Sequence, residues 1–178
     1  MIDPRSLRPL AVALLWLSVG MLVTGCGFRL RSYNLEAGVE SYAMTGQVQS
    51  RVAQPLRQGL KQAGVPEAES PAQAEMIIEL LDQRVERRSA STGRNARATE
   101  YEMTIGVQFA LTDGAGNELA PARWIERGRV FRIDRENIVG ASEEQAILER
   151  EMVQDLVGQI IRAMDAVSRS SLAAIDAS

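Results

Sequence analysis

A dense group of arginines is the feature of this sequence best suited to binding a ligand. The segment QRVERRSASTGRNARATE, residues 83–100, carries five arginines and one acid, Glu86, before it ends at Glu100. The local excess is therefore four positive charges. Guanidinium groups bind phosphate oxygens through paired hydrogen bonds, and an anion would offset the repulsion among crowded like charges. The segment predicts an anion-binding hairpin whose arginines are Arg84, Arg87, Arg88, Arg94 and Arg97.

The same arginines have a second interpretation, in which they only keep an exposed edge strand soluble. The overall charge does not decide between the two, because the chain has 20 basic and 23 acidic residues and a net charge of −3. This acidic balance does not indicate nucleic-acid binding. Lys61 is the single lysine, so almost all basic function would depend on arginine.

Groups for covalent or metal chemistry are scarce. The chain has one cysteine, Cys26, and no histidine, which excludes a Cys-His catalytic pair, an internal disulfide and the usual zinc sites. Glu100 and Glu102 lie two residues apart on one strand face and are the nearest candidates for a paired-acid site. They are better explained as the solvent-facing side of that strand. We therefore expect no enzyme activity, no metal and no cofactor.

The cysteine lies at the end of a secretory signal. A short polar start precedes the uncharged apolar run 10–23, which predicts a signal peptide cleaved after residue 25. The run is too short for the roughly 20 residues that cross a bilayer. Val-Thr-Gly-Cys, residues 23–26, resembles the lipobox of bacterial lipoproteins, which implies that Cys26 carries a diacylglyceryl group and an N-acyl chain. Gly27 in place of Asp favours the outer membrane.

Hydrophobic periodicity predicts the elements that position these groups. Alternating apolar and polar residues indicate strands, and apolar residues every three or four positions indicate helices. The expected strands cover about residues 42–44, 76–85, 101–111 and 124–133, and the expected helices cover 47–63 and 142–167. A turn cluster at 113–117 places the last three strands in an antiparallel meander. Pro55 either kinks the first helix or marks its true beginning.

The domain limits follow from the same patterns. Ser142 and Gln145 form a capping box, so the second helix is expected to begin at Ser142. Behind the cleaved signal 1–25, we expect a lipidated N-terminus and tether at 26–39, one α/β domain at 40–168 and a flexible polar tail at 169–178.

These pieces together resemble the LptE family of lipopolysaccharide-assembly lipoproteins. The resemblance rests on CGFRLR after the signal, PLRQGLKQAGV in the first helix, GRNARATEYEM in the hairpin, and RVFRID followed by EEQAILEREMVQDLVGQIIRAM. It spans nearly all of the mature chain. It implies an α/β sandwich in which two helices pack on one face of a four-stranded mixed, mainly antiparallel sheet.

The resemblance also implies a ligand. Family members bind lipopolysaccharide with basic residues on the hairpin and near the start of the last helix, and Arg94 matches the hairpin position. The expected lipopolysaccharide contacts are Arg94, Arg97 and Arg88. The second basic position falls in residues 140–142, where this sequence has Gly-Ala-Ser. Arg97, or Arg132 and Arg135 before the last helix, would have to replace it.

The resemblance finally implies a partner and a place. Members sit as a plug inside LptD, the outer-membrane barrel that inserts lipopolysaccharide into the outer leaflet. We therefore expect an outer-membrane lipoprotein, anchored by lipid on the periplasmic side, that binds lipopolysaccharide and this barrel. The alternative is a periplasmic scaffold lipoprotein that binds protein partners only.

Overall fold

The computed structural model describes residues 38–92, 98–134 and 138–176. Within these ranges, no helix is apolar over a long enough stretch to cross a membrane. The elements in chain order are β1 (Tyr42–Gly46), α2 (Ala53–Gln62), the 3-10 turn η1 (Pro71–Gln73), β2 (Met76–Thr92), β3 (Ala98–Thr112), β4 (Glu118–Asp134) and α3 (Ile138–Asp176).

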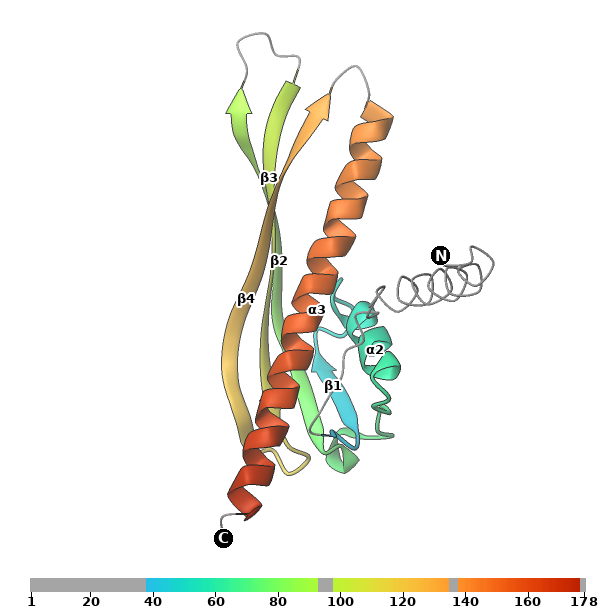
Figure 1. Ribbon diagram of the computed structural model, residues 1–178, viewed down its shortest axis with the longest axis vertical. Coiled ribbons are helices and arrows are strands. Elements are labelled where there is room, and N and C mark those ends of the chain that lie inside the picture. The colour runs from blue at the N-terminus through green and yellow to red at the C-terminus, as the bar shows by residue number, and fades with distance from the viewer. Residues whose placement is uncertain (1–37, 93–97, 135–137, 177–178) are drawn as a thin grey trace, which may run out of the picture. The chain divides into compact units, whose positions relative to one another are not determined.

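The strands form one sheet in the order β1-β2-β3-β4. β1 is parallel to β2, and β2, β3 and β4 form the predicted antiparallel meander. The predicted turn at 113–117 joins β3 to β4, and the Asp113 carboxylate accepts hydrogen bonds from the backbone N–H groups of Ala115 and Asn117. Figure 1 shows that the end of β2, the start of β3, the end of β4 and the start of α3 lie at the same end of the sheet.

Two helices cover one face of the sheet, which confirms the predicted fold (Figure 1). Every second residue of β3 from Met103 to Leu111 points into the core and is almost fully buried, as the alternation of that strand predicted. Leu156 and Ile160 of α3 and Leu56 of α2 are completely buried in the same cluster. No helix of the described residues packs on the opposite face of the sheet, which is called the open face below.

α2 is shorter than its apolar pattern predicted, because Pro55 lies in its first turn. A proline fits there, since the first N–H groups of a helix have no partner within it. The helix ends where Gly64 adopts a φ of 82° and the Val65 N–H donates to the Leu60 carbonyl, an arrangement typical of a Schellman motif. This ending turns the chain back over β1.

α3 begins four residues before the predicted cap, so the prediction that Ser142 starts the helix is wrong. Ser142 is exposed inside the helix, whereas Ala141 is buried. Packing of this first turn on the sheet extends the helix past a locally favourable start, as tertiary contacts often do. At its other end α3 continues to Asp176, so residues 169–176, expected as a tail, are helical.

Candidate functional site

The arginines of β2 are divided between the two faces of the sheet. Side chains alternate along a strand, and Arg84 and Arg88 point to the open face, opposite Gly106 and Glu102 of β3 in the strand register. Arg87 points to the helix-covered face, opposite Met103. The dense group seen in the sequence is therefore not a single surface patch along the described part of the hairpin.

On the open face, each described arginine of the hairpin lies beside an acid. Arg88 Nη2 lies 2.6 Å from Glu86 Oε2, and Arg84 Nε lies 3.5 Å from Asp82 Oδ2. The Arg88 side chain nevertheless remains 75% exposed. A guanidinium has five N–H donors, so these contacts occupy only part of its capacity to bind oxygen atoms.

A further pair joins β3 to β4 near the same end of the sheet. Arg132 Nη2 donates to Glu100 Oε1 at 2.8 Å, and this bond raises the pKa of the Arg132 guanidinium. Glu100, one of the two candidate acids, is therefore engaged with a cation, while Glu102 is exposed on the same open face. Across 38–92, 98–134 and 138–176, no group of acidic side chains could hold a metal ion.

A hollow of about 330 Å³ lies in the open face and surrounds Trp124 of β4. The indole lies against β3 at Gly106, where an added Cβ would come within 2.3 Å of the ring. Its Nε1 donates to Glu126 Oε2 at 3.1 Å, and the Arg84 guanidinium lies 5.3 Å from the ring centroid. Both contacts hold the ring in place, although 38% of Trp124 stays exposed.

The charges around this hollow do not favour a phosphate. Two arginines and three glutamates line it, so their sum is −1. The lining charged residues are Arg84, Arg88, Glu86, Glu102 and Glu126. The residues around the hollow therefore supply no local excess of positive charge of their own.

On the helix-covered face, the hairpin end has a small aromatic stack. Arg87 lies 5.1 Å from the ring centroid of Tyr101, and this ring stacks on Phe131 at 5.9 Å. Phe131 is 3% exposed. The stack fixes the relative positions of all three long strands just below the point where the hairpin connection leaves the sheet.

The predicted lipopolysaccharide contacts Arg94 and Arg97 lie outside the described residues, as does Arg135. Arg88 is described and exposed on the open face. Residues 140–142 lie in the first turns of α3, at the same end of the sheet as the hairpin connection (Figure 1). Sequence reasoning did not find the Trp124 hollow. The signals in the sequence were a tryptophan at the start of one expected strand and a glycine, Gly106, at an outward-facing position of the neighbouring strand.

Comparison with known proteins supports one family. Residues 31–164 match the family model described as LptE, Lipopolysaccharide-assembly. No curated protein matches the chain. Among solved structures, the chain is similar to the uncharacterized lipoprotein B from Nitrosomonas europaea, with 25% identity and a TM-score of 0.66 over 82% of this chain and 95% of that chain.

Two further solved structures share the fold. The rare lipoprotein B from Shewanella oneidensis is 22% identical, with a TM-score of 0.62 over 74% of this chain and 98% of that chain. A minor lipoprotein from Acinetobacter baumannii is 19% identical, with a TM-score of 0.59 over 72% of this chain and 92% of that chain. At these identities the likeness concerns the fold alone.

Proposed function

Because the chain belongs to the LptE lipopolysaccharide-assembly family, we propose that it is an outer-membrane lipoprotein that binds lipopolysaccharide and partners the barrel LptD. The observation that carries the ligand proposal is the local excess of arginines in the hairpin sequence, together with the 75% exposure of the Arg88 side chain. The contacts we propose are Arg94, Arg97 and Arg88.

The chemistry of these side chains suits the phosphates of a glycolipid. Charge-assisted hydrogen bonds from a guanidinium to a phosphate are short and strong, and two can form in parallel. Arg88 presents an exposed guanidinium toward the hairpin end of the open face. In this proposal the protein binds one glycolipid and presents it to the barrel, and no covalent bond is made or broken.

A plug inside a barrel needs a rigid body with a polar exterior. The three long strands provide rigidity, because their hydrogen-bonded registers continue from the core to the hairpin end. The open face offers polar and charged side chains on alternate positions, which suits the polar interior of a large barrel. The proposed anchor is Cys26, which would hold this body at the periplasmic surface of the outer membrane.

The ligand proposal is tested by charge reversal on the hairpin. We expect Arg94→Asp to weaken lipopolysaccharide binding, and Arg94→Asp with Arg97→Asp to weaken it further, because each change replaces a phosphate partner by a repelling charge. The melting temperature should stay nearly unchanged, since the buried cluster is made by other residues. Binding is measured with the purified lipoprotein and labelled lipopolysaccharide.

Arg162→Asp is the matched control for that experiment. Arg162 is exposed on α3, so this variant makes the same change of charge away from the hairpin. If the hairpin variants and the control bind lipopolysaccharide equally well, the scaffold alternative is favoured and the ligand proposal fails.

The partner and the anchor have separate tests. We expect the barrel to co-purify with the tagged lipoprotein from solubilised outer membranes, and recovery of the lipoprotein alone would contradict the partner proposal. Cys26→Ser should abolish labelling with radioactive palmitate, because the thiol that accepts the lipid is gone. Continued labelling of this variant would contradict the proposed anchor.

A further inference from the structure

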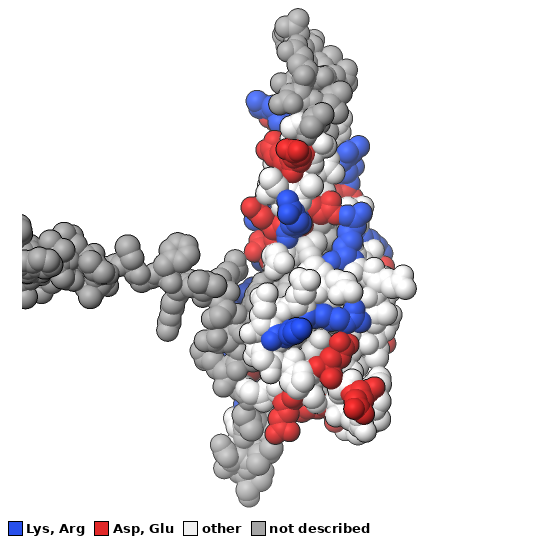
Figure 2. Space-filling model, turned by 90° about the vertical axis from the view of Figure 1, so that its right-hand side faces the viewer, with Lys and Arg blue, Asp and Glu red and all other residues white. Residues whose placement is uncertain are grey.

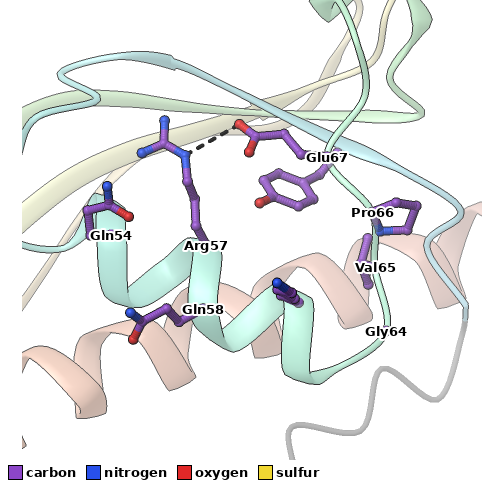
Figure 3. A pocket seen from close by; sticks show the side chains of 9 residues that line it. Gln54, Arg57, Gln58, Gly64, Val65, Pro66 and Glu67 are labelled. Atoms are coloured by element: carbon purple, nitrogen blue, oxygen red, sulfur yellow. Dashed lines mark hydrogen bonds and ion pairs between the residues drawn. The ribbon is translucent and has the colours of Figure 1, made fainter.

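A second hollow, of about 580 Å³, lies between α2 and the chain segment that returns to β1. Figure 3 shows it from close by, with α2 on one side and Glu67, Pro66 and Val65 on the other. It is separate from the hairpin, and no step of the proposed function uses it. The residues that line it are Tyr42, Gln54, Arg57, Gln58, Lys61, Gly64, Val65, Pro66 and Glu67.

The polar groups of this hollow come from three neighbouring elements. Arg57 Nε lies 3.4 Å from Glu67 Oε1, and Figure 3 shows this pair at the rim of the hollow. Tyr42 lines the same hollow. Tyr42 is only 2% exposed, and burial together with the neighbouring Glu67 raises its pKa to about 12. The phenol therefore keeps its proton over the whole physiological range.

The charges around this hollow favour an anion, unlike those of the Trp124 hollow. Arg57 and Lys61 are four residues apart on α2 and lie on the same side of the helix. Glu67 is the one acid among the lining residues, so the sum is +1. Figure 2, which views the side where α2 lies, shows basic side chains in a band across the middle of this surface.

The hollow is also tied to the start of the domain. The Tyr42 N–H donates to the Pro66 carbonyl at 3.1 Å, and the Ala68 N–H donates to the Tyr42 carbonyl at 2.7 Å. Tyr42 follows Cys26 by 16 residues (42 − 26) in the sequence. Even a fully extended chain of this length spans at most about 58 Å, so a lipid on Cys26 keeps the hollow within that distance of the bilayer.

We propose that this hollow binds the headgroup of an anionic phospholipid in the leaflet that holds the anchor. Arg57 and Lys61 contact the phosphate, and the exposed ring of Pro66 lies against the glycerol end. The inference rests on the proposed lipid anchor at Cys26. A tether raises the effective concentration of lipid at the hollow, so a contact too weak to act in solution is occupied here.

Such a contact would orient the domain. Anchor and headgroup contact together give two membrane attachments, which restricts rotation about the tether more than one attachment does.

The single lysine gives a direct test. Reductive methylation with ¹³C labels the Lys61 amine and keeps its charge, and no other side chain in the sequence has an amine. The mature, acylated full chain is labelled, then placed in nanodiscs of phosphatidylcholine with or without phosphatidylglycerol. Each disc contains a phospholipid with a spin label on its headgroup and no lipopolysaccharide.

We expect the Lys61 methyl resonance to broaden in discs with phosphatidylglycerol and to sharpen again in 1 M salt, where the Debye length is about 3 Å. Arg57→Gln should remove the broadening, whereas Arg84→Gln, which loses the same charge on the open face, should keep it. Equal broadening with and without phosphatidylglycerol, or none in either, would overturn the inference.

Mass spectrometry of the chain in the disc separates the two possible failures. An acylated chain whose Lys61 resonance stays sharp contradicts only the headgroup contact. A chain without acyl groups contradicts the proposed anchor, and the headgroup contact falls with it.

Discussion

The two ends of the sheet are held together in different ways. At the end near β1 and α2, the strands and helices enclose aliphatic side chains such as Ile78, Leu56 and Leu156, all completely buried. At the hairpin end, large side chains are partly exposed: Val85 is 44% and Val130 is 60% exposed. There the strands depend on ladder hydrogen bonds, the Tyr101–Phe131 stack and exposed ion pairs.

This difference separates stability from recognition within one sheet. Burial of an aliphatic side chain contributes about 1.5–3 kcal/mol, whereas an exposed ion pair contributes about 0–1 kcal/mol. The hairpin end can therefore carry charged side chains for a ligand, and substitutions there lower the free energy of unfolding only slightly. The end near α2 supplies most of the free energy of folding, and this lets the hairpin remain extended.

The largest expected effect on stability comes from a cavity in the buried end. We expect Leu156→Ala to lower the free energy of unfolding by about 3–5 kcal/mol, because it removes buried contacts and leaves a space that the close-packed core fills only in part. Val130→Ala, on the exposed hairpin end, should change it by about 0.5 kcal/mol or less. Urea unfolding followed by circular dichroism measures both values.

Equal losses for Leu156→Ala and Val130→Ala would contradict the comparison, because the hairpin end would then contribute as much as the core. The native far-ultraviolet spectrum of each variant, before urea is added, is the control that the strands and helices still form.

Residue patterns predicted the buried end well and the hairpin end less well. The alternation from Tyr101 to Leu111 located β3, because one face of that strand is buried along its length. β2 extends to Thr92, well beyond the predicted limit of residue 85. Its ladder with β3 continues past Val85, where the side chains of residues 86–89 are exposed and periodicity gives no signal. Pairing between strands, not burial, forms this part.

The site was harder to predict than the fold, since it depends on contacts between distant residues. Ser142 and Gln145 form a capping box that favours a helix start, yet α3 begins earlier, at Ile138. Ala141 is buried, so packing overrides this local signal. The hollow beside α2 combines Tyr42 with Arg57 and Glu67 from separate elements. No spacing in the sequence indicates that these three side chains meet.

A smaller effect, within the buried end, concerns pH. Folding raises the pKa of Tyr42 to about 12, above the usual value of about 10 for the unfolded chain. The unfolded state therefore releases the phenol proton first, and the free energy of unfolding falls as pH rises between these two values. We expect a loss of roughly 1–3 kcal/mol across this window, which Tyr42→Phe should lack.

Urea unfolding of the wild type and Tyr42→Phe, at several pH values above 9, gives this difference directly. All other side chains are the same in both proteins, so their contributions to the pH dependence cancel. Parallel curves for the two proteins would contradict the raised pKa.

The smallest expected effect tests the ion pairs that connect α3 to β4. Asp155 Oδ2 lies 3.5 Å from Arg129 Nη2 and 3.9 Å from Arg127 Nε, and all three side chains are partly exposed. We expect Asp155→Asn to lower the free energy of unfolding by about 1 kcal/mol or less in low salt, because water screens these charges. The difference should shrink in 1 M salt, where the Debye length is about 3 Å. Asp165→Asn, which loses a pair within α3 itself, is the control for a general effect of acid removal. If Asp155→Asn instead lowered the free energy of unfolding as much as Leu156→Ala does, and 1 M salt did not reduce this loss, ion pairs would hold α3 on the sheet. That result would contradict the contrast between an apolar end and a charged end.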